Sequence, residues 1–257
     1  MSHAPLNDYS YSESPETIPL KQSRIISSVL SPSVRMWLRS QVEQVEDLQV
    51  KIQGGDRLIL SGHVPNVSLS ARRAVYQGLH LRQIQIAAQA IRINLGQILK
   101  GKPLRLLAPV PVNGELVLEE TDLQASLASN LLPGALNEFL VTLLKAGGLP
   151  NSNDVLKNRQ VIWQEITIDY GKIQLKGTVT DDNKSDDSFP ILICTGIEIA
   201  NGNYLLLTEP QIKGPFGSNV TFAKPVEINL GSDVEIEELT LTPGRLICRG
   251  RLLVRTD

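Results

Sequence analysis

The stretch that decides the fold runs from residue 57 to residue 114 and reads RLILSGHVPNVSLSARRAVYQGLHLRQIQIAAQAIRINLGQILKGKPLRLLAPVPVNG. Apolar and polar residues alternate along most of it, which is typical of β-strands. It contains no Asp and no Glu, whereas the whole chain has a net charge of -2. The segregation predicts a basic sheet that attracts an anionic surface. Its eight cations are Arg57, Arg72, Arg73, Arg82, Arg92, Lys100, Lys102 and Arg105.

The alternation changes parity within this stretch. Leu79 and Leu81 share one parity, Ile84 and Ile86 take the other, and Ile91 returns to the first. Side chains alternate between the two faces of a strand, so each slip moves the apolar set across the sheet. Such slips, together with the proline at position 65, predict strands that are bent and strongly twisted.

Helical spacing of apolar residues precedes the basic stretch. Residues 22–30 form one amphipathic piece, and Ser31-Pro32 restarts the pattern, which continues to about Glu46. The turn signal Gly54-Gly55-Asp56 separates alternating residues 48–52 from 58–64, which predicts a β-hairpin. Further on, residues 104–106 and 116–118 are predicted to be strands.

A second helical region follows. Thr121 and Gln124 match a capping box, which predicts a short helix to about Ala128. Residues 132–144 form a strongly apolar helix that ends at Gly147-Gly148. The two helical regions resemble each other in pattern at an offset of 102 residues, so a duplicated αβ unit and a chance coincidence both remain open.

The last hundred residues are predicted to be mainly strands, with turns at Tyr170-Gly171 and Asn201-Gly202 and a polar acidic loop over 181–188. The predicted strands are 162–168, 173–179, 189–199, 204–208, 226–230, 234–241 and 246–254. The fold class is therefore α+β, with a long, curved, mainly antiparallel sheet wrapped around two amphipathic helical regions. Residues 1–21 are expected to be a disordered tail. Residues 22–257 are expected to form a single domain with halves of about 22–118 and 119–257.

No pattern in the sequence indicates an enzyme. The nucleophile-elbow, P-loop, dinucleotide-binding and zinc-protease motifs are missing, and no cofactor or metal site is predicted. His63 and His80 lie in strand-like runs without a neighbouring acid, and Cys194 and Cys248 are expected to be buried thiols. Neither a secretory signal nor a membrane-spanning run is visible. The expected location is cytoplasmic, or peripheral on the cytoplasmic face of the membrane.

The basic stretch has two interpretations. Its arginines could be ordinary solvent-facing residues, but solvent faces normally mix both signs of charge. The functional interpretation is attraction to lipid headgroups, because low aromatic content and the lack of a recognition motif argue against nucleic acid. The predicted headgroup residues are Arg72, Arg73, Arg82, Arg92, Lys100, Lys102 and Arg105. The predicted apolar groove consists of Trp37, Leu38, Leu132, Leu136, Phe139, Leu140 and Leu143.

Two alternatives stay open. A protein-interaction module would dock an acidic partner through residues 57–114 and would have a fully packed core. An enzyme would need a hydroxyl group that folding brings to His63 or His80, or a cluster of carboxylates. No particular protein partner is indicated.

Several segments resemble one bacterial family. They are residues 31–40 (SPSVRMWLRS), 78–81 (GLHL), 91–94 (IRIN), 101–104 (GKPL) and 121–127 (TDLQASL). They are similar to the LmeA-type phospholipid-binding family, formerly a domain of unknown function, over about Arg24 to Val254. The resemblance implies non-enzymatic binding of anionic phospholipid by an elongated α+β fold with an apolar groove. Characterised members are exported to the cell envelope, whereas no export signal is visible in this sequence.

Overall fold

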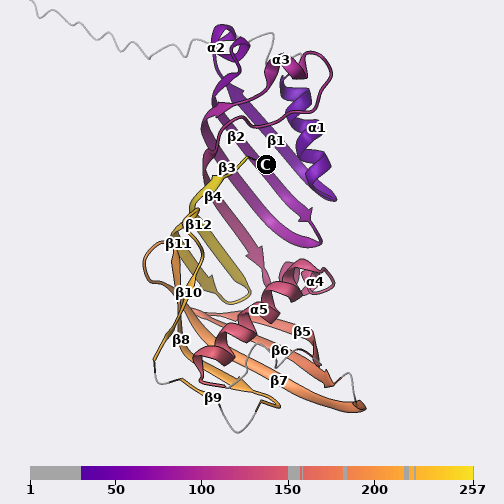
Figure 1. Cartoon of the computed structure of the whole chain (residues 1–257), viewed down its shortest axis with the longest axis vertical. Helices are drawn as coiled ribbons and strands as arrows, with labels where there is room; N and C mark the ends of the chain where they lie inside the picture. Colours follow the sequence, from indigo (N-terminus) through magenta and orange to yellow (C-terminus); the bar gives the residue numbers. More distant parts are fainter. Residues whose placement is uncertain are drawn as a thin grey trace, which may run out of the picture.

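The computed structural model describes residues 30–149, 157, 159–181, 184–216, 220–222 and 224–256. Two antiparallel sheets lie one after the other along an elongated molecule (Figure 1). The predicted α+β class with curved antiparallel strands is confirmed, and the strands divide between two sheets. The predicted tail over 1–21 and the predicted helix over 22–29 lie outside the described residues.

Sheet 1 has the strand order β1-β2-β3-β4-β12-β11, so the last two strands of the chain return to the first sheet. Three helices accompany it: α1 (Ser31–Gln41), α2 (Asp56–Leu60) and α3 (Leu95–Ile98). Its strands are β1 (Gln44–Gln53), β2 (His63–Tyr76), β3 (Leu79–Arg92), β4 (Val110–Glu119), β11 (Val234–Thr242) and β12 (Arg245–Val254). Helices α2 and α3 lie together at one end of the molecule, which we call the tip (Figure 1).

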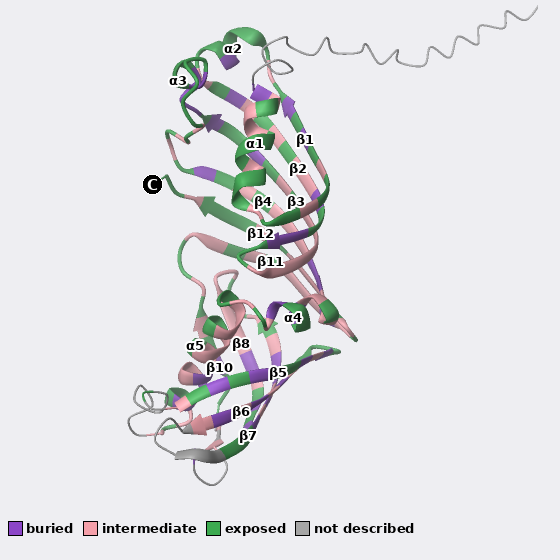
Figure 2. Cartoon of the chain, turned by 90° about the vertical axis from the view of Figure 1, so that its right-hand side faces the viewer, coloured by how far each residue is buried: buried purple, intermediate pink, exposed green. Residues whose placement is uncertain are grey.

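Sheet 2 has the order β10-β8-β7-β6-β5, with β9 paired to β8. Its strands are β5 (Arg159–Asp169), β6 (Lys172–Asp181), β7 (Lys184–Ile199), β8 (Tyr204–Lys213), β9 (Val220–Thr221) and β10 (Val226–Asn229). Helix α5 (Leu131–Ala146) packs on this sheet and buries Leu140, Leu143 and Leu144 completely. Figure 2 shows α1 and α5 on the same side of the two sheets.

Two positions of positive φ mark bends within continuous strands, and one of them, Ala90, lies at the predicted parity slip before Ile91. Arg73 and Ala90 have φ angles of 46° and 52°, a region that residues other than glycine rarely adopt. Arg73 lies just before buried Ala74, and Ala90 lies between buried Ala88 and Ile91. Each bend therefore lets two buried residues of opposite parity reach the same side of the sheet.

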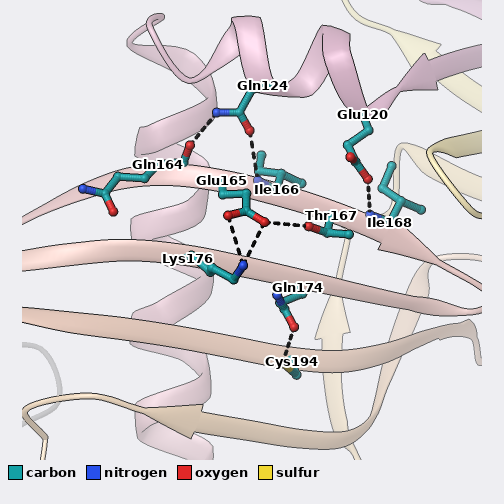
Figure 3. A network of polar contacts seen from close by, with 10 residues as sticks. All are labelled: Glu120, Gln124, Gln164, Glu165, Ile166, Thr167, Ile168, Gln174, Lys176 and Cys194. Carbon is teal, nitrogen blue, oxygen red and sulfur yellow. Dashed lines mark hydrogen bonds and ion pairs between the residues drawn. The ribbon is translucent and has the colours of Figure 1, made fainter.

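Helix α4 (Glu120–Ser126) joins the two sheets. Ser126 Oγ accepts a hydrogen bond from the backbone of His80 on β3, at 2.8 Å. On the other side, Glu120 and Gln124 hydrogen-bond to the backbone of β5, the edge strand of sheet 2 (Figure 3). Two side chains of α4 thus take the place of a neighbouring strand along that edge.

The same view shows three contacts between side chains on the strands of sheet 2, one of them from the Thr167 hydroxyl to Glu165 at 3.2 Å. The Lys176 ammonium bonds to Glu165 and lowers the pKa of that carboxyl group (Figure 3). Because the pair is exposed, we expect it to contribute little to stability. The Cys194 thiol donates to Gln174 on the next strand, at 3.4 Å.

Four local predictions are wrong. Helix α1 ends at Gln41, because β1 begins at Gln44 and needs residues up to 46 as strand. Residues 58–60 belong to helix α2, which buries Ile59 and exposes its two neighbours. Residues 104–106 form only the isolated bridge between Ile93 and Leu106. The capping box uses Glu119 and Asp122.

The predicted acidic loop is shorter than expected. Strand β6 extends to Asp181, and β7 begins at Lys184, so strands occupy most of 181–188. The two residues between them lie outside the described residues. The other predicted strands of the C-terminal region are confirmed within a few residues.

Candidate functional site

An apolar cavity of about 270 Å³ lies between α1 and sheet 1. Eighteen residues line it, and all of them are apolar. Helix α1 contributes Val34, Trp37 and Leu38, and the strands and the loop after α3 contribute most of the rest. The remaining lining residues are Leu30, Ile52, Val64, Val67, Leu69, Ile86, Ala88, Ile91, Ile93, Leu104, Leu106, Val110, Val112, Leu252 and Val254.

Strand alternation builds the wall of the cavity. The strand pairing aligns one apolar side chain from each strand in a row across the sheet. Alternate residues of a strand point to opposite faces, so the polar residues between them lie on the other side. We call the face that α1 covers the inner face. The row consists of Ile52, Val67, Ala88, Val112, Leu252 and Val234.

The inner face extends beyond the cavity toward sheet 2. A second row crosses the sheet nearer to α4 and consists of Ala71, Ile84, Leu116, Cys248 and Leu239. Leu116 and Leu239 pack against the core of α5 and sheet 2. Four of the five members of this row are only partly buried. The apolar surface is therefore continuous from the cavity to the second core, and partial burial raises the pKa of the Cys248 thiol.

Buried Asn94 fixes the loop that closes one side of the cavity. Its Oδ1 accepts a hydrogen bond from the backbone N–H of Arg105 at 2.7 Å. Its Nδ2 donates to the carbonyl oxygen of Pro103 at 2.9 Å. These contacts hold Leu104 and Leu106 against the cavity, and the polar side chain is satisfied within the fold.

The predicted headgroup residues fall into two groups. Arg92, Lys100, Lys102 and Arg105 are exposed around α3 and the loop that follows it, near the tip. Arg72, Arg73 and Arg82 lie toward the opposite end of the β2–β3 hairpin. Arg73 pairs with Glu46 at 3.1 Å, and Arg82 pairs with Glu119 at 2.6 Å and with Asp122 at 3.1 Å.

The predicted groove residues also divide. Trp37 and Leu38 line the cavity. Leu132, Leu136, Phe139, Leu140 and Leu143 lie on α5 and pack in the core of sheet 2, away from the cavity lining. The structure therefore brings two of the seven residues to the cavity.

Sequence reasoning missed the strand residues that form the cavity wall. The sequence places Ile86 and Ala88 in a predicted strand, but Val112 lies between the predicted strands 104–106 and 116–118, and Leu252 lies 140 residues beyond Val112 in the chain. The available signal was the shared parity of these apolar positions. Pairing between β4 and β12 is needed to place them in one row, and local spacing does not reveal it.

Among the residues that the structure describes, the surroundings of His63 form no developed site. Ser61 Oγ lies 3.1 Å from His63 Nδ1 on an exposed turn, and it donates to the carbonyl oxygen of Leu58 at 2.6 Å. Neither Ser61 nor His63 lines the cavity. Within the described residues, no group of three potential metal ligands comes together.

Comparison with protein families decides the affiliation. A family model described as LmeA-like phospholipid-binding matches residues 21–251. The chain belongs to this family. Comparisons with curated proteins and with solved structures gave no match. Membership in the LmeA-like family supports lipid binding in general, and an all-apolar cavity suits acyl chains.

One helix pair resembles a membrane span by length and composition. Among the described residues, no single helix is both long enough and apolar enough to cross a bilayer. Helices α4 and α5 reach the required length only as a pair bent by 95°.

Proposed function

We propose that this LmeA-like protein binds a phospholipid without chemical turnover and holds an acyl chain in the cavity between α1 and the inner face. The observation that carries the proposal is the lining of eighteen apolar residues. Burial of one CH₂ group contributes about 0.8 kcal/mol, so a chain of several methylenes gains substantial free energy there. A cavity of about 270 Å³ is close to the lower limit for small-molecule sites, and the open inner face offers further apolar surface.

The direct test is lipid loading. We expect delipidated protein, incubated with vesicles and re-isolated, to carry one phospholipid per chain in native mass spectrometry. A protein that stays lipid-free with every vesicle composition would contradict the proposal. The cavity also distinguishes this function from the protein-interaction alternative, which requires a filled interior.

We further propose that the tip docks on anionic membranes. Four leucines there are unusually exposed: Leu58, Leu60, Leu99 and Leu107, at 53%, 58%, 56% and 60%. The cations Arg92, Lys100, Lys102 and Arg105 lie in the same region. Exposed leucines among cations suit the boundary between headgroups and acyl chains, where each cation contributes about 1 kcal/mol.

The docking proposal predicts a loss of vesicle binding when the tip becomes polar. The double variant Leu58→Ser and Leu60→Ser should bind vesicles containing phosphatidylglycerol at least about tenfold more weakly, because burial of each leucine contributes about 1.5–3 kcal/mol. Flotation at low and high salt measures the effect, and binding by the unaltered protein should weaken with salt.

A matched control alters two exposed apolar residues of sheet 2, Ile162→Ser and Phe189→Ser. This variant should float like the unaltered protein. Equal losses in both variants would place docking elsewhere, and equal binding to neutral and anionic vesicles would remove the electrostatic part of the proposal.

A further inference from the structure

A second hollow, of about 470 Å³, adjoins the apolar cavity. Trp37, Leu104, Leu106 and Val254 line both spaces. The three residues that line only the second hollow are polar: Arg105, Arg255 and Thr256. The apolar cavity and the more polar hollow are therefore neighbours that share four lining residues.

Alternation along two chain segments produces this arrangement. Arg105 lies between Leu104 and Leu106, whose side chains line the cavity. Arg255 likewise follows Val254, the last residue of β12. The hydrogen bonds from Asn94 to the backbone of Pro103 and Arg105 hold this loop in place. The Arg105 side chain therefore projects from a fixed backbone position.

The charged side chains that line the hollow, among the described residues, are cationic. Among the described residues that line it, two are arginines and none is acidic. Asp233, in the turn just before β11, accepts two hydrogen bonds from Arg255 at 2.6 Å and 2.7 Å. This pair engages two of the five N–H groups of Arg255 and leaves the others able to donate. Within the described part of the chain, Arg105 has no carboxylate within ion-pair distance.

We propose that this hollow binds the phosphate ester of a lipid headgroup between Arg105 and Arg255, while an acyl chain of the same molecule occupies the cavity. The inference rests on the proposed lipid-binding function and assigns the position of the headgroup. Guanidinium groups bind phosphate oxygens through two parallel hydrogen bonds, and Thr256 adds a hydroxyl donor. Trp37 lines both the cavity and the hollow, and its indole ring has an apolar body and a polar N–H group, so it suits contact with an acyl chain and with a headgroup.

The position of the hollow favours an amphiphile over a soluble anion. A phosphate ester with an attached hydrocarbon chain would occupy the hollow and the cavity at once, because the two lie side by side and share lining residues. A soluble phosphate ester would use only the arginines, which lie in an exposed site where water weakens such contacts.

The test compares two lipids with identical acyl chains, phosphatidylglycerol and diacylglycerol, offered together in vesicles. Native mass spectrometry of the re-isolated full chain gives the ratio of the two bound lipids. We expect the unaltered protein to prefer phosphatidylglycerol, and Arg105→Gln to reduce this preference about tenfold, because charge-assisted hydrogen bonds to phosphate are lost. Because both lipids come from the same vesicles, their ratio isolates this effect from the weaker vesicle docking expected when one tip cation is lost.

Two further variants sharpen the comparison. Arg245→Gln removes the same charge at the opposite end of β12, and it should leave the preference unchanged. Asp233→Asn removes the carboxylate that engages Arg255, so the preference for phosphatidylglycerol should rise.

The outcomes separate this inference from the function on which it rests. Uptake of neither lipid would overturn the lipid-binding function itself. Uptake of both lipids with the same ratio in Arg105→Gln and Arg245→Gln would overturn the phosphate site and leave the cavity intact.

A last experiment measures binding of soluble glycerol 3-phosphate to the lipid-free protein. Binding that depends on Arg105 in the absence of lipid would assign the hollow to free phosphate esters, and no binding would support the lipid headgroup.

Discussion

Ala88→Phe should reduce lipid uptake at least about tenfold. Ala88 lies on β3 and lines the cavity, and its small side chain leaves space that a phenyl ring can occupy. The ring would take the volume that we assign to the acyl chain, and each excluded CH₂ removes about 0.8 kcal/mol of binding free energy. Because the ring enters existing space, the free energy of unfolding should stay level or rise by about 0.5–2 kcal/mol.

The neighbouring residue provides the matched control. Ala87 is exposed on the opposite face of the same strand, where it lines a polar hollow together with Ser68 and Asn113. Ala87→Phe adds the same ring and should leave lipid uptake unchanged. Native mass spectrometry after vesicle incubation measures both variants. Full uptake by Ala88→Phe would show that the acyl chain binds outside the cavity.

The contrast between Ala87 and Ala88 also shows what the sequence could predict. Strict alternation over residues 84–88 identified a strand and assigned these two residues to opposite faces. It did not identify which face would be covered by a helix or which would contain a cavity. That depends on how α1 packs over β1 and on the return of β12 beside β4. Both are long-range contacts, and local periodicity contains no information about them.

Helix α2 shows why one strand prediction failed. The run Leu58-Ile59-Leu60 fits a strand if Leu58 and Leu60 are buried, and it fits one helical turn if Ile59 is buried. The structure buries Ile59 completely and exposes both leucines at the tip. A three-residue apolar run is too short to distinguish these two arrangements. The exposure of these leucines, on which we base the docking proposal, therefore became visible only in the structure.

Helix α4 shows how tertiary contacts override a local capping signal. Thr121 and Gln124 have the spacing of a capping box, but Glu119 and Asp122 have it too. The structure uses Glu119 and Asp122, and Gln124 instead bonds to strand β5. The sequence thus predicted a helix in the right place without revealing that its side chains would hold the edge of sheet 2.

That edge gives the second large prediction, for the double variant Glu120→Ala and Gln124→Ala. Gln124 Oε1 accepts from the backbone N–H of Ile166 at 3.2 Å, and Glu120 Oε2 accepts from that of Ile168 at 2.9 Å. Both isoleucines are almost completely buried, so their N–H groups would lose their partners in a poorly hydrated site. An unsatisfied buried group costs about 1–3 kcal/mol, so we expect the free energy of unfolding to fall by about 2–4 kcal/mol.

Urea denaturation of the double variant measures this loss, and Gln164→Ala is the matched control. Gln164 lies on the same edge strand, and only its backbone oxygen bonds to Gln124, while its side chain points away (Figure 3). The control should unfold at the same urea concentration as the unaltered protein. The double variant should also associate at high concentration in light scattering, because an uncovered strand edge pairs with other chains. If its urea midpoint matched that of Gln164→Ala, the side chains of α4 would not be what secures the edge of sheet 2, and the joint between the two sheets would have to depend on apolar packing alone.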